Sequence, residues 1–137
     1  MEPMATDAPR PAFANDEMRG AVGGGIDPAV LRAVVGDDPA MIREIVADFV
    51  PAARTGIDEI RAAAASAVAE RVRLSSHKLK GSSGLVGAVA LAELCAELEA
   101  AGRAGDWQLI GELVPRLDRL MQEVQSSAER FLGTGQS

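Results

Sequence analysis

Aromatic residues are scarce in this sequence: the 137 residues include one tryptophan, three phenylalanines and no tyrosine. All-β domains usually contain more aromatic and β-branched strand formers than this. Hydrophobic residues still make up 47% of the chain, so small and aliphatic side chains can build a core. The composition therefore favours closely packed helices, and the length favours one domain.

Cysteine, long apolar runs and positive charge are also scarce. The one cysteine, Cys95, cannot form an internal disulfide or a thiolate metal cluster, and it lies on an apolar helical stripe, where we expect it to be buried. No apolar run approaches the roughly 18–20 residues of a membrane span, and the N-terminus lacks the pattern of a signal peptide. The net charge of −6 argues against wholesale nucleic-acid binding. We expect a cytoplasmic protein that binds neither membrane nor nucleic acid, and a monomer.

Proline and glycine divide the chain into three parts. Residues 1–25 contain several prolines and end in three glycines, without a sustained apolar period, which predicts a flexible N-terminal arm. Residues 26–132 form the helical domain. Residues 133–137 are predicted to be a frayed C-terminal tail.

Two Asp-Pro pairs, Asp27-Pro28 and Asp38-Pro39, each combine an N-cap with proline at the first helical position. The first pair predicts a short helix that ends near Gly36. The second opens a long helix whose apolar spacing continues to about residue 64. Pro51 interrupts this run, and we expect it to kink the helix rather than to split it, because the apolar stripe continues beyond it.

Three further amphipathic segments follow. They cover residues 67–86, with Ser66 as the expected N-cap, residues 88–102, and residues 106–131, where Pro115 is a second candidate kink. Helices with one apolar stripe bury it together, and short connections make neighbouring helices antiparallel. The sequence thus predicts an all-α fold: an up-down-up-down four-helix bundle with a short extra N-terminal helix.

The only histidine, His77, and the only two lysines, Lys78 and Lys80, lie within four positions of one another. On the helix of residues 67–86, the face of His77 also holds Arg73, Lys80, Gly81 and Gly84. The opposite face holds the apolar residues Val68, Val72, Leu79 and Val86. We therefore expect His77 to face outward, where the simplest interpretation is an ordinary surface histidine.

Three features favour a functional histidine instead. The stretch from Arg71 to Ala92 contains no acidic residue, so its basic side chains predict an anion-binding patch. Gly81 and Gly84 each cost a helix about 1 kcal/mol relative to alanine, which suggests that another surface approaches closely there. Ser82 and Ser83 keep the surroundings of His77 small and polar. The chemistry that fits is nucleophilic, because a neutral imidazole is a good nucleophile near pH 7 and an exposed one can attack a phosphoryl group held by a partner.

The run from His77 to Ala88 (His-Lys-Leu-Lys-Gly-Ser-Ser-Gly-Leu-Val-Gly-Ala) closely resembles the signature of histidine-containing phosphotransfer (HPt) domains. Residues 91–99 and the turns at residues 36–38 and 105–106 also resemble this family, and the resemblance spans residues 27–132. Ser76 stands where the family often has alanine. The resemblance implies a four-helix bundle with an exposed phosphorylated histidine, which exchanges its phosphoryl group with receiver-domain aspartates in a two-component phosphorelay.

The resemblance also implies roles for individual residues. His77 would be the phosphoacceptor, and Lys80 would stabilise the phosphate as a mobile ammonium. The chain would need no cofactor, because the Mg²⁺ belongs to the receiver, and it would be a carrier without an ATP site rather than an enzyme. Its partners would be receiver domains of response regulators or a hybrid histidine kinase. They would dock on Arg73, Lys78, Gly81, Gly84 and Ala88.

Other interpretations remain open. The chain could be a docking module that carries no phosphate and that sequesters a response regulator or inhibits a kinase. It could also be a purely structural bundle in which the basic patch arose by chance. A metal site at His77 is disfavoured, because one histidine without a neighbouring carboxylate or thiolate does not make a ligand set. Glu93, Glu97 and Glu99 are expected to form a solvated helix face rather than a metal site.

Overall fold

The computed structural model describes the backbone of residues 25–136 and the side chains of residues 25–133. The predicted arm lies outside the described residues except for Gly25, which is buried. The part of the chain that is described contains helices and turns but no strand, which confirms the all-α prediction. The helices are α3 (Pro28–Val35), α4 (Pro39–Ala65), α5 (Ala69–Leu85), α6 (Val89–Ala104), α7 (Trp107–Leu113) and α8 (Arg116–Gln136).

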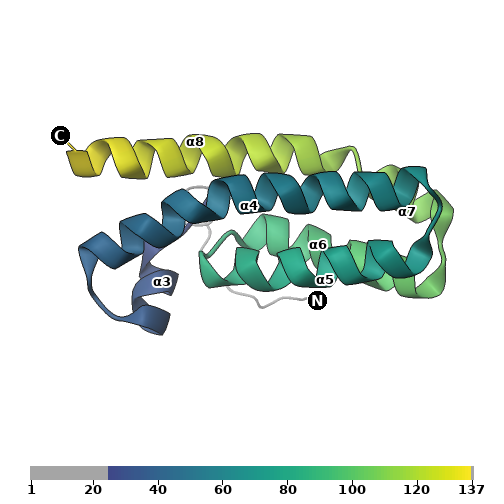
Figure 1. Cartoon of the computed structure of the whole chain (residues 1–137), viewed down its shortest axis with the longest axis horizontal. Helices are drawn as coiled ribbons and strands as arrows, with labels where there is room; N and C mark the ends of the chain where they lie inside the picture. Colours follow the sequence, from purple (N-terminus) through teal and green to yellow (C-terminus); the bar gives the residue numbers. More distant parts are fainter. Residues whose placement is uncertain (1–24, 137) are drawn as a thin grey trace, which may run out of the picture.

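The four long helices α4, α5, α6 and α8 lie side by side along the long axis of the molecule (Figure 1). Helix α5 packs between α4 and α6, and α8 closes the bundle by packing against α4 and α6. The core between them consists almost entirely of leucine, isoleucine, valine and alanine side chains. Because α5 has helices on both flanks, only one strip of its surface remains open to solvent.

Both predicted Asp-Pro helix starts are present. A side-chain oxygen of Asp27 accepts a hydrogen bond from the Ala29 backbone N–H at 3.0 Å, and Asp38 accepts one from Ala40 at 3.1 Å. Helix α4 continues through Pro51 without a break. Figure 1 shows the first part of α4, in blue, inclined to the teal remainder, as expected of a proline kink.

The predicted start of the next helix is wrong. Ser66 ends α4 as its C-cap, because α4 extends to Ala65, and the chain then turns at Ala67 with a φ of +57°. Helix α5 begins after Val68, which has no side-chain cap. The Val68 side chain, predicted to be on the buried stripe, is 37% exposed because it lies in this turn.

The last predicted helix is two helices. Asp106 caps α7 as expected, accepting a hydrogen bond from the Leu109 N–H at 3.1 Å. Helix α7 ends at Leu113, and α8 begins directly after Pro115, so this proline separates two helices. A proline has no N–H to donate, and that loss costs little at a helix start. Helix α8 extends through Gln136, into the segment 133–137 that was predicted to be a tail.

None of the described helices is both long and apolar enough to cross a membrane.

Candidate functional site

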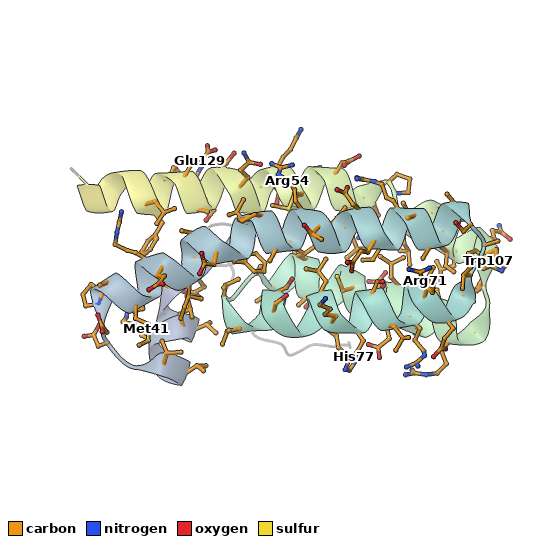
Figure 2. All side chains as sticks on the ribbon, viewed as in Figure 1. Met41, Arg54, Arg71, His77, Trp107 and Glu129 are labelled. Carbon is orange, nitrogen blue, oxygen red and sulfur yellow. The ribbon has the colours of Figure 1, made fainter. Side chains whose placement is uncertain are left out.

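His77 lies near the middle of α5, and its side chain is 64% exposed. Figure 2 shows the ring directed away from the ribbon, on the opposite side of the molecule from Arg54 and Glu129. The inner face of α5 is buried through Val72 and Leu79. The predicted outward position of His77 is therefore confirmed.

One nitrogen of the His77 ring is held by a carboxylate of the next helix. Nδ1 of His77 lies 3.0 Å from Oε2 of Glu99, which projects from α6 with a side chain only 8% exposed. An ionised carboxylate can only accept a hydrogen bond, so we assign the ring proton to Nδ1. In the neutral ring, Nε2 then carries the free lone pair. Nε2, which Glu99 does not contact, is therefore the nitrogen that can act as a nucleophile.

Glu99 also binds two cations. Nζ of Lys80 lies 2.8 Å from Oε1 of Glu99, and Nη2 of Arg103 lies 3.4 Å from Oε2. The hydrogen bond from Lys80, followed by the one from His77, lowers the pKa of Glu99 below its ordinary value, although burial acts in the opposite direction. Glu99 is therefore ionised at neutral pH and joins His77 and Lys80 through one carboxylate.

A close crossing of α5 and α6 places Glu99 beneath His77. A Cβ atom on Gly102 would lie 2.8 Å from the backbone nitrogen of Arg73, closer than real Cβ atoms come, and 3.0 Å from the carbonyl oxygen of Ala69. Only glycine permits this approach of the two backbones. Gly102 lies one turn after Glu99 on α6, and Arg73 lies one turn before His77 on α5, so the close crossing is next to the contact between Glu99 and His77.

The prediction for Glu99 is therefore wrong. Glu93 and Glu97 lie on an exposed face as expected, whereas Glu99 is buried. A signal for this was present in the sequence: Cys95, Glu99 and Gly102 share one side of α6 at helical spacing, and Cys95 lies on the apolar stripe. A lone acid on a buried face indicates a polar partner on the neighbouring helix.

The predicted basic patch is partly neutralised. Arg73 binds Glu70 on its own helix, with Nε 3.0 Å from Oε1, and Lys80 is paired across to α6. Within the described part of the chain, Arg71 and Lys78 form no salt bridge, and both are exposed. The acid-free stretch in the sequence did not reveal this neutralisation, because Glu70 lies just before the stretch and Glu99 lies on another helix.

The residues predicted to dock a partner differ in their exposure to solvent. Gly81 and Gly84 are exposed, and a Cβ atom on either would meet nothing within 4 Å. Lys78 is exposed beside them, next to a groove of about 320 Å³ that runs between α4 and α5. Ala88 is fully buried. Its prediction as a docking residue is wrong, because α5 ends at Leu85 and the following turn folds into the core.

Metal and thiol chemistry find no support near this surface. Among the described residues, no three His, Cys, Asp or Glu side chains are grouped as a metal ion would need. Cys95 is buried as predicted, and burial raises the pKa of its thiol to about 12. It therefore remains a protonated core residue.

The sequence profile of the Hpt domain matches residues 44–127, a segment that contains His77, Lys80, Glu99 and Arg103. The chain belongs to the Hpt domain family. Hpt domain proteins transfer phosphoryl groups on histidine in phosphorelays, as phosphocarriers that have no ATP site of their own.

A solved Hpt structure has the same fold. The crystal structure of histidine-containing phosphotransfer protein B (HptB) from Pseudomonas aeruginosa PAO1 superposes with a TM-score of 0.75 and 25% sequence identity, over 82% of this chain and 97% of that one. No curated protein sequence matches the chain. The Hpt profile and the fold thus establish the family.

Proposed function

We propose that His77 accepts a phosphoryl group from the aspartate of one receiver domain and passes it to the aspartate of another. The observation that carries this proposal is the exposed imidazole whose Nδ1 is held 3.0 Å from the buried Glu99. This contact orients the ring and leaves Nε2 as the nucleophile.

The reaction follows from this arrangement. The Nε2 lone pair attacks the phosphorus of the receiver's aspartyl phosphate, the bond from phosphorus to the carboxylate oxygen breaks, and the carboxylate leaves with its electron pair. The ring gains positive charge as the phosphorus–nitrogen bond forms. Glu99 stabilises that charge through the Nδ1 proton. Transfer to the next receiver is the same step in reverse.

Lys80 supplies a positive charge on the same helix as His77. Its ammonium group lies one helical turn from His77, and its side chain is 39% exposed. A flexible lysine can turn from Glu99 toward a phosphoryl group on Nε2 and offset part of its negative charge. We therefore propose Lys80 as the phosphate-stabilising residue.

The receiver docks, in our proposal, on the open strip of α5 that includes Gly81 and Gly84. Neither glycine is required by the fold, since a Cβ atom on either would lie in open space. Each costs the helix about 1 kcal/mol relative to alanine, so the reason for glycine lies outside this chain. Lys78 and Arg73 border the strip.

The Mg²⁺ of the reaction belongs, in our proposal, to the receiver, so the chain itself needs no cofactor.

The direct test is phosphoryl transfer from a panel of radiolabelled phospho-receivers to the wild type and to His77→Ala. Acid-labile, base-stable label on the wild type alone supports the proposal. Because His77 is exposed, the variant should keep its helicity by circular dichroism. Absence of label from every receiver, in a folded protein that still binds one, would identify a docking module instead.

A further inference from the structure

Three groups share the carboxylate of Glu99. Lys80 binds Oε1 at 2.8 Å, whereas His77 and Arg103 both contact Oε2, at 3.0 and 3.4 Å. The contact of Arg103 is the longest of the three, and its side chain is 62% exposed. In the unphosphorylated protein, Lys80 is therefore the main counter-charge of Glu99, and Arg103 is a neighbouring cation with a weak contact.

Phosphorylation changes this balance of charge. A phosphoryl group on Nε2 of His77 adds about two negative charges beside Lys80. If Lys80 turns toward that group, Glu99 loses its closest cation. The side chain of Glu99 is only 8% exposed, and a buried carboxylate without a partner is strongly unfavourable. Without Lys80, Glu99 keeps the Nδ1 hydrogen bond from His77 on Oε2 and the longer contact of Arg103, and Oε1 has lost its cation.

We infer that Arg103 takes the place of Lys80, so that phosphorylation exchanges the ion-pair partner of Glu99. Arg103 follows Glu99 by one turn on α6, and its guanidinium already contacts the carboxylate. A planar guanidinium can bind both carboxylate oxygens at once, so a small movement replaces the lost bond. Arg103 is thus a positioning residue that acts through Glu99, and the inference rests on the proposed phosphorylation of His77.

The competing interpretation is an ordinary ion pair on the helix surface. Such a pair contributes little to stability and is indifferent to the state of His77. The partner exchange differs in two ways. It makes Arg103 matter for the phosphorylated protein, and it makes that effect depend on the negative charge of Glu99.

Phosphoramidate provides a test that needs no receiver. It donates its phosphoryl group directly to a histidine: its own phosphorus–nitrogen bond breaks, the bond to Nε2 forms, and ammonia leaves. The decay of phosphohistidine is followed by ³¹P NMR in the wild type, Arg103→Ala, Arg103→Lys and Arg116→Ala. Arg116 is the matched control, because it also pairs with a glutamate of α6, Glu97 at 3.8 Å, away from His77.

The partner exchange predicts a specific pattern. Arg103→Ala should shorten the phosphohistidine lifetime about two- to fivefold, Arg103→Lys should restore most of it, and Arg116→Ala should leave it unchanged. In a Glu99→Gln background, Arg103→Ala should have no further effect, because a neutral amide needs no cation. The Arg103 guanidinium signals in ¹H–¹⁵N NMR should shift on phosphorylation of the wild type.

Two kinds of failure are distinguishable. If phosphoramidate labels the wild type no more than His77→Ala, the proposed function itself fails. If the wild type is labelled but a helical Arg103→Ala decays at the wild-type rate, the partner exchange is overturned. An Arg103→Ala effect that persists in full in the Glu99→Gln background overturns it as well.

Discussion

Nδ1 of His77 lies 3.0 Å from Oε2 of Glu99, so an exposed imidazole on α5 is held by a nearly buried carboxylate on α6. This contact distinguishes the two ring nitrogens. It assigns the proton to Nδ1 and leaves Nε2 for chemistry.

Replacing Glu99 by alanine should slow phosphorylation of His77 by about tenfold or more, since a hydrogen bond to a charged group contributes roughly 1.5–3 kcal/mol. Labelling by phosphoramidate measures the rate, and ¹⁵N NMR of the ring reports the tautomer. Glu97→Ala, on the exposed face of the same helix, is the control. A wild-type ring protonated mainly on Nε2 would contradict the assignment.

Glu99 should also make stability depend on pH. Its pKa is lowered from the ordinary value of 4.5, chiefly by the hydrogen bond from Lys80. A group whose pKa is lower in the folded than in the unfolded state contributes stability above its unfolded pKa, and this contribution is lost as the pH falls through the folded value. Urea unfolding should therefore show a steeper loss of stability below about pH 5 in the wild type than in Glu99→Gln.

The matched control for this titration is Glu93→Gln, because Glu93 is exposed on the same helix. It should follow the wild-type curve. Parallel curves for the wild type and Glu99→Gln would show that the lowered pKa of Glu99 has no role in stability.

Gly81→Ala and Gly84→Ala should separate folding from docking. A Cβ atom at either position meets nothing within 4 Å, so each variant should be as stable as the wild type or more stable, by up to about 1 kcal/mol. Both should be labelled normally by phosphoramidate, which needs little space. Transfer from a phospho-receiver should be slower, because the added methyl group projects into the docking surface. Normal transfer from the receiver in both variants would place the docking surface elsewhere.

Gly102→Ala should have the opposite effect on folding. The new Cβ atom would lie 2.8 Å from the backbone nitrogen of Arg73, so α5 and α6 must separate, at a cost of about 1–3 kcal/mol. The separation should also weaken the contact between His77 and Glu99, visible as a change in the ¹⁵N signals of the ring. Gly111→Ala is the control, because nothing lies within 4 Å of its added Cβ atom. Equal melting temperatures for the two variants would show that the crossing is not tight.

Some features were predictable because they depend on neighbouring residues. The Asp27 and Asp38 caps each involve a side chain and an N–H two residues away. The burial of Leu79 and the exposure of His77 follow from helical periodicity within α5. The helix ends were less predictable: Ser66 can cap either of two helices, and Pro115 is compatible with a kink or with a new helix start.

The sequence by itself determined that this chain is helical and that His77, with Lys80, Gly81 and Gly84, lies on one outward face, because a single helix fixes the relative directions of its own side chains. Only the tertiary structure decided that Glu99 is the acid that pairs with His77 and Lys80. All three glutamates of α6 were expected on a solvated face, but Glu99 contacts His77 next to the close crossing at Gly102, while Glu93 and Glu97 face solvent. Helical spacing places Glu99 on the apolar side of α6, but its pairing with His77 depends on the contact between the backbones of two separate helices, which the pattern within either segment does not encode.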